Sequence, residues 1–192
     1  MKKLLAIFIL ASLSCNQSNE KIKAETESKK PTDSTSEAKS HSVKKYFDYD
    51  QIDHYFNDFD NNKSLELIDN RNTTPIDSIK AGVLLSGIPK TIDDTLFITQ
   101  LEKAEFKKNV ISAEEFPKID KIFTERPGQL IGSASKCVAI YRDVLIFKKQ
   151  KKIIGIAKIC FRCGQEKIIG TSANTNNFGQ NGDYEKLESI LR

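Results

Sequence analysis

The chain has 192 residues, of which 29% are charged and 39% hydrophobic, and its formal net charge is +4. This length accommodates one domain and an additional extended segment. Nucleic-acid-binding proteins usually concentrate basic residues on one face. The small net charge does not fit that class, so we predict no nucleic-acid partner. The two histidines, His41 and His54, leave little scope for imidazole catalysis or a multi-histidine metal site.

The first 14 residues predict a targeting signal and not part of the fold. Lys2 and Lys3 precede a mostly apolar run of about ten residues, whereas a membrane-spanning helix needs about 20. The run is therefore typical of a signal-peptide core, with residues 1–14 removed. It leads to Cys15 and resembles a bacterial lipoprotein signal, although Ser12 stands where Leu is usual. The resemblance implies a lipid such as palmitate on Cys15, and the alternative is ordinary cleavage that leaves a thiol there.

Residues 15–44 have the composition of a linker. They are rich in Ser, Thr, Lys, Glu and Asn and carry almost no large apolar side chain. Such a segment cannot bury enough surface to offset its ordering entropy. We expect a disordered tether that joins a lipid anchor to a single domain over residues 45–192. The expected location is the bacterial cell envelope, with the membrane contacted through the N-terminal lipid.

The first half of this domain has mainly helical patterns. Residues 51–57 alternate in part and predict a strand. Thr74-Pro75-Ile76-Asp77 combines a cap residue, a proline and a first-turn acid, which is typical of a helix start. Helical patterns begin at Asn61, Thr74, Thr91 and Ser112.

The pattern changes after Pro127-Gly128. Residues 137–148 and 152–162 are rich in β-branched and aromatic side chains, which predicts a hairpin with the lysines between them at its tip. A third strand is expected near 167–171, and Asp183 is expected to cap a last helix. The predicted class is α+β, with a helical N-terminal half packed on a small antiparallel β-meander and a closing C-terminal helix.

Three cysteines of the domain are predicted to lie close together. If Gln150 and Lys151 centre the hairpin turn, Cys137 falls beside Cys163, and Cys160 lies nearby. A structural disulfide, Cys137–Cys163 or Cys160–Cys163, suits an oxidising compartment. A redox site would use Cys160 and Cys163. A metal site of three thiolates lacks an apparent fourth ligand, and simple burial of the thiols is a further alternative.

Two motifs of the C-terminal half carry a resemblance. Tyr141-Arg142-Asp143 and Ile159-Cys160-Phe161-x-Cys163, followed by a closing helix, resemble uncharacterised small lipoproteins of Bacteroidetes-like bacteria over roughly residues 75–192. The resemblance implies an envelope location and the extent of the domain, but no catalytic residue.

No catalytic, cofactor-binding or metal-binding residue is predicted. His54 and Asp53 are neighbours on a predicted strand, where alternation points their side chains to opposite faces. We therefore expect a lipid-anchored envelope lipoprotein with a non-enzymatic structural or binding role. The alternatives are a thiol-redox protein or enzyme that uses Cys160 and Cys163, and a metal-binding module.

Overall fold

A computed structural model of the chain describes residues 43–63, 66, 68, 74–85, 87–128 and 136–192. The predicted signal peptide, Cys15, His41 and nearly all of the predicted linker lie outside these residues. Most of the helix expected over 61–70 also lies outside the described residues. At the start of that range the structure has a single 3-10 turn, η1 (Asn61–Lys63). No helix among the described residues is long and apolar enough to cross a membrane.

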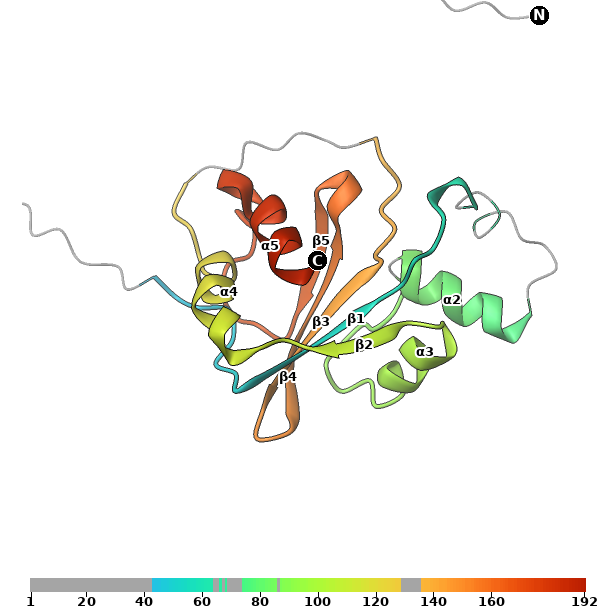
Figure 1. The fold of residues 1–192 in the computed structure, drawn as a ribbon, viewed down its shortest axis with the longest axis horizontal. Coiled ribbons are helices and arrows are strands. Elements are labelled where there is room, and N and C mark those ends of the chain that lie inside the picture. The colour runs from blue at the N-terminus through green and yellow to red at the C-terminus, as the bar shows by residue number, and fades with distance from the viewer. Residues whose placement is uncertain (1–42, 64–65, 67, 69–73, 86, 129–135) are drawn as a thin grey trace, which may run out of the picture. The chain divides into compact units, whose positions relative to one another are not determined.

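The domain contains a five-stranded antiparallel sheet in the order β2-β1-β3-β4-β5. Helices cover both faces, with α2 and α3 on one side and α4 and α5 on the other (Figure 1). The strands are β1 (Gln51–Phe56), β2 (Lys107–Val110), β3 (Asp143–Lys149), β4 (Lys152–Cys160) and β5 (Gln165–Ile169). The α-helices are α2 (Pro75–Leu85), α3 (Phe97–Lys103), α4 (Phe116–Ile122) and α5 (Asp183–Leu191).

The predicted helical N-terminal half on a small β-meander is wrong. β1 and β2 come from that half and belong to the same sheet as the C-terminal strands, with β1 paired directly to β3. The four central residues of β1 are all buried, because helices cover both of its faces. β2 reads Lys-Lys-Asn-Val and is fully exposed, so it lacks the alternating apolar pattern from which strands are predicted.

Alternation along the central strand divides the apolar side chains between two cores. Val144 and Ile146 of β3 pack with α2 and α3, whereas Leu145 and Phe147 pack with α4 and α5. All four side chains are fully buried. Full burial of one such side chain contributes roughly 1.5–3 kcal/mol relative to exposure.

The predicted β3–β4 hairpin turn is confirmed. Lys149 pairs with Lys152, and the two residues between them, Gln150 and Lys151, have φ angles of 48° and 66°. Positive φ at both central positions is the geometry of a type I′ turn, whose twist matches that of the flanking strands. The strand predicted over 137–148 begins later than expected, at Asp143.

The predicted start of α2 is also confirmed. The Oγ1 atom of Thr74 accepts a hydrogen bond from the backbone N–H of Asp77 at 3.2 Å. In return, the carboxylate of Asp77 accepts one from the backbone N–H of Thr74, also at 3.2 Å. This reciprocal arrangement is a capping box, with Asp in the position that Glu or Gln often takes.

Candidate functional site

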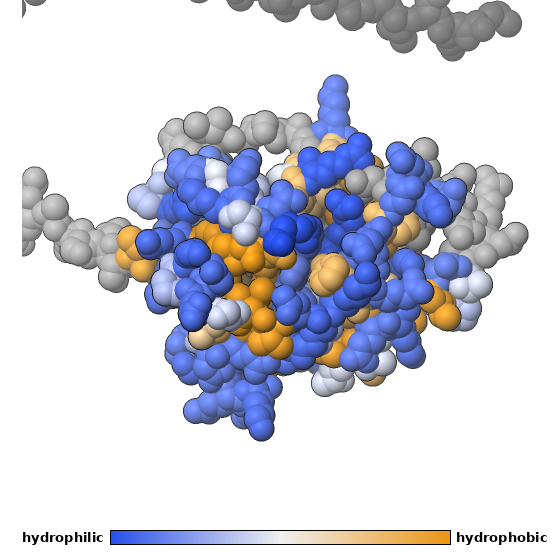
Figure 2. Space-filling model, viewed as in Figure 1, coloured by the Kyte–Doolittle hydropathy of each residue, from blue (hydrophilic) through white to orange (hydrophobic). Residues whose placement is uncertain are grey.

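A groove lies between α4 and α5, on the sheet face that these two helices cover. Its volume is about 460 Å³, which falls within the range of small-molecule sites. Figure 2 shows hydrophobic surface between the two helices, framed by hydrophilic groups. The lining side chains are Glu115, Lys118, Lys121, Ile122, Arg126, Asp183, Lys186, Ser189 and Ile190.

Helical spacing places these side chains along two facing stripes. On α4, Lys121 and Ile122 both lie about one turn after Lys118, and on α5 Ile190 lies about one turn after Lys186. Ile119 and Ile122 of α4 and Leu187 of α5 are buried and anchor the two helices on the core, so Ile122 borders both the core and the groove. The two walls therefore each carry lysine and isoleucine.

Two charge pairs lie within the groove. Lys118 Nζ donates a hydrogen bond to Glu115 Oε1 at 3.0 Å, and Arg126 Nη2 donates one to Asp183 Oδ1 at 2.6 Å. The Lys118 side chain of the first pair is largely exposed, so this pair contributes little to stability. The second joins two residues that are 57 positions apart in the sequence.

Two further cations of the groove are not balanced in this way. Lys121 and Lys186 form no salt bridge with any described residue. The ammonium group of Lys186 donates instead to the carbonyl oxygen of Asn181 at 2.6 Å. Each wall of the groove consequently carries one ammonium group without a salt bridge, and that of Lys186 acts electrostatically on Asp183.

Asp183 is the buried acidic residue of the groove. The expectation that it caps α5 is wrong, since the N-cap is Gly182, with φ 75°, and Asp183 is the first helical residue. Its side chain is fully buried, and its Oδ2 atom has no hydrogen-bond partner among the described residues. Burial raises the pKa of Asp183 despite the opposing effects of the Arg126 guanidinium, the Lys186 ammonium group and the backbone N–H of Gly179. An unpartnered buried acceptor is costly, so this oxygen favours a ligand that brings a donor.

Arg126 lines the groove and bonds to both of its walls. Besides its bond to Asp183, its guanidinium donates to the carbonyl oxygens of Lys121 at 3.1 Å and Gln180 at 3.3 Å. It thereby joins the end of α4 to the start of α5. Sequence reasoning missed this residue, because no local pattern links it to its partners.

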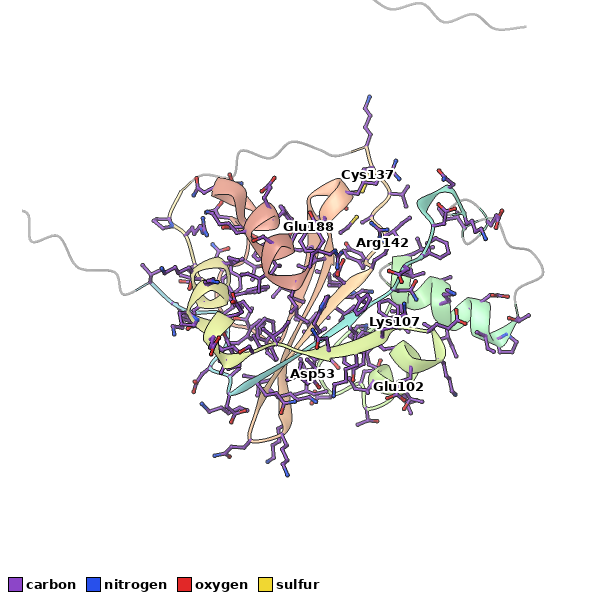
Figure 3. All side chains as sticks on the ribbon, in the orientation of Figure 1. Asp53, Glu102, Lys107, Cys137, Arg142 and Glu188 are labelled. Atoms are coloured by element: carbon purple, nitrogen blue, oxygen red, sulfur yellow. A yellow bond between two sulfur atoms is a disulfide. The ribbon has the colours of Figure 1, made fainter. Side chains whose placement is uncertain are left out.

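Of the two disulfide pairings predicted for these cysteines, the structure contains Cys137–Cys163 and not Cys160–Cys163. Cys137 and Cys163 are bonded, with their Cα atoms 5.7 Å apart, and the bond joins the segment before β3 to η3 (Phe161–Cys163). Figure 3 shows Cys137 at the end of the β3–β4 hairpin that lies opposite its turn. Cys160 ends β4 close by and is buried and free. The three cysteines therefore gather at the open end of the hairpin, as their spacing predicted.

This arrangement offers little support for thiol or metal chemistry. Cys163 is occupied by Cys137, and Cys160 is 4% exposed. The Cys-x-x-Cys motif begins at the end of a strand, whereas redox motifs use a helix N-terminus to lower the thiol pKa. Within the described part of the chain, no group of three or more His, Cys, Asp or Glu residues is arranged to hold a metal ion.

His54 belongs to a separate buried cluster. Its Nε2 atom lies 2.9 Å from Asp143 Oδ1, and Arg192 donates two hydrogen bonds of 2.9 Å to the same carboxylate. His54 and Asp143 are 1% and 2% exposed. Asp53 contacts Lys108 and not His54, so the predicted opposite orientation of these neighbours is confirmed. None of the clustered residues lines the groove, and their contacts tie β1, β3 and the chain after α5 together.

No family model matches this chain, and no curated protein or solved structure does. The function is therefore inferred from the N-terminal sequence and from the chemistry of the groove.

Proposed function

We propose that this protein is a lipid-anchored lipoprotein of the bacterial envelope whose domain binds a small ligand between α4 and α5. The N-terminal sequence supports the lipid anchor and the envelope location, and the resemblance to Bacteroidetes-like lipoproteins agrees with them. The observation that carries the binding role is the groove itself. It combines a buried carboxylate oxygen without a hydrogen-bond donor, at Asp183, with two lysines that form no salt bridge with the described residues, Lys121 and Lys186.

The lining of the groove favours binding over catalysis. Nucleophilic catalysis requires a nucleophile within hydrogen-bond reach of a general base. The hydroxyl group of the groove belongs to Ser189, and it donates to the carbonyl oxygen of Lys186, one turn earlier in the same helix, at 2.7 Å. A serine committed to its own backbone in this way is not activated.

The first described residues of the chain are bonded to the segment after α4. The backbone N–H of Tyr46 donates to the carbonyl oxygen of Phe123 at 2.9 Å, and Glu125 donates to the carbonyl oxygen of Lys44 at 2.8 Å. Both bonds lie just after the end of α4. The first described residues of the domain are therefore tied to the segment that follows α4.

The anchor is tested on the full chain produced in a bacterium with the lipoprotein pathway. We expect membrane association, acyl mass on Cys15 and release into the soluble fraction in Cys15→Ala. A thiol count gives an independent readout. A thioether-linked lipid leaves one reactive thiol, that of Cys160, in the denatured but unreduced protein. An intact leader, or cleavage elsewhere without acyl mass, would falsify the anchor.

The binding role is tested by native mass spectrometry of the protein released gently from the envelope. We expect a bound small molecule, and we expect its loss in Ser189→Trp, which places a large ring in the groove. Glu185→Trp is the matched control, because Glu185 is an exposed residue of the same helix and does not line the groove. Retention of the ligand in Ser189→Trp, or its loss in both variants, contradicts this site.

A further inference from the structure

We propose that the groove recognises a small zwitterion of the α-amino acid type, namely an aliphatic amino acid or a short aliphatic peptide with free amino and carboxyl groups. This assignment rests on the proposed binding role and names the class of ligand. Three features of the lining carry it: an acceptor, a pair of cations and a short apolar floor.

The acceptor is Asp183 Oδ2. It is buried without a partner, while Oδ1 of the same carboxylate is occupied by Arg126 at 2.6 Å. An ionised carboxylate accepts hydrogen bonds only, and its strongest partners are charged donors. A primary ammonium group supplies up to three N–H donors together with a positive charge. It is therefore the natural complement of this oxygen.

The pair of cations is Lys121 and Lys186. They come from opposite walls, line the same groove and form no salt bridge with the described residues. Lys118 differs from them, because Glu115 already balances its charge. An anionic group between the two walls would attract both ammonium groups, neither of which is held in a salt bridge. A ligand that satisfies these cations and Asp183 together carries both signs of charge.

The apolar floor consists of Ile122 and Ile190. They are two of the nine lining residues, so the apolar part of the ligand is short. An aliphatic side chain suits such a floor, whereas a long acyl chain would leave most of its surface in water. The volume of about 460 Å³ also suits a small ligand. These limits favour an amino acid or short peptide over a lipid.

The class of ligand is tested by calorimetry on the purified full chain in detergent. The probes are leucine, leucylleucine, leucinamide, N-acetylleucine and phosphoethanolamine. We expect leucine or leucylleucine to bind, and we expect at least about tenfold weaker binding when either charged group of that ligand is blocked. A hydrogen bond between charged groups contributes enough free energy for a change of this size.

Single substitutions test which side chains of the groove contribute to binding of the amino acid. Lys121→Met and Lys186→Met should each weaken binding by about tenfold or more, while Lys118→Met should change it less than about twofold. Asp183→Asn should weaken binding of the free amine selectively and leave N-acetylleucine unaffected. This comparison within one variant does not depend on its stability, because both ligands are measured on the same folded protein.

The outcomes separate the two proposals. If native mass spectrometry finds a ligand that Ser189→Trp removes, but the amino acids do not bind, the ligand class is wrong and the binding role stands. Preferential binding of phosphoethanolamine would likewise overturn the amino-acid class in favour of a lipid headgroup. Equal effects of Lys118→Met and Lys121→Met would overturn the assigned cations.

Discussion

The ammonium group of Lys158 donates a hydrogen bond of 2.7 Å to the carbonyl oxygen of Ile88. Lys158 lies on β4 and is fully buried, with its Nζ atom 5.0 Å from the ring centroid of Tyr141. No salt bridge balances its charge among the described residues. Burial, with a smaller effect of Lys167 on the neighbouring strand, lowers the pKa of Lys158 to about 7.

This buried lysine should make the protein more stable as the pH rises from 7 to 9. In this range the unfolded lysine, with a pKa near 10.5, binds a proton that the folded lysine releases. The expected gain is on the order of 2 kcal/mol. Lys158→Met should remove it, as measured by urea unfolding at both pH values. Lys152→Met, at the exposed hairpin tip, is the control and should keep the wild-type difference. A Lys158→Met protein that also kept it would contradict the assigned titration.

The carboxylate of Asp143 should stabilise the fold through its buried partners. Burial acts to raise the pKa of Asp143, but the hydrogen bonds from His54 and Arg192 outweigh it, and the pKa is lowered. We expect Asp143→Asn to lower the free energy of unfolding at pH 7 by about 3 kcal/mol. This is the low end for a broken buried pair, because the Arg192 side chain is 45% exposed.

The effect of Asp143 should also depend on pH. Because the folded pKa is lowered, its stabilisation is complete above the unfolded pKa of about 3.8 and is lost as the pH falls through the folded pKa. The gap between wild type and Asp143→Asn should therefore narrow in acid. Asp48→Asn, which breaks a pair whose carboxylate side chain is 91% exposed, should cost less than about 1 kcal/mol. Equal losses in the two variants would contradict a special role for the buried carboxylate.

The Cys137–Cys163 disulfide should stabilise the domain by restricting its unfolded state. It joins positions 26 residues apart, for which loop-closure entropy predicts about 3.5 kcal/mol. The double variant Cys137→Ser with Cys163→Ser should lose about this much in chemical denaturation. Cys160→Ala removes a sulfur from the same region, retains the crosslink and should cost about 1 kcal/mol. A double variant as stable as Cys160→Ala would refute the structural role.

Gly155 should tolerate no side chain. It lies on β4, and the ring of Phe47 occupies the space that a Cβ atom would need, stacked on Phe147 at 4.4 Å between centroids. Gly155→Ala should destabilise the protein by about 1–3 kcal/mol, because the packed ring must move. Gly82→Ala is the contrasting variant, since its Cβ atom meets Ile88 at 3.4 Å inside α2. Helix propensity should offset that contact, so its thermal midpoint should stay near or above that of wild type.

Local features of the sequence predicted several parts of the structure. The hairpin turn at Gln150 and Lys151 follows from β-rich segments on either side of a basic tip. The start of α2 follows from Thr74 and Asp77, whose side chains cap backbone groups three residues away. The hairpin register in turn predicted that Cys137 and Cys163 would meet. Each of these predictions needs interactions only between residues close in sequence or related by one turn.

The sheet and the groove depended on contacts that no local pattern reveals. β1 and β3 are far apart in the sequence but pair directly. The inclusion of β1 in the five-stranded sheet therefore depends on contacts between distant segments. Asp183 has the local pattern of a helix cap, yet its carboxylate turns to Arg126, 57 residues earlier. By itself the sequence determined the hairpin, the helix start and the proximity of Cys137, Cys160 and Cys163, because neighbouring backbone groups and strand alternation specify them. Which two of these cysteines are bonded was decided by the tertiary structure. The tertiary structure alone decided which faces are buried and which charges meet in the groove, because these depend on packing between distant segments.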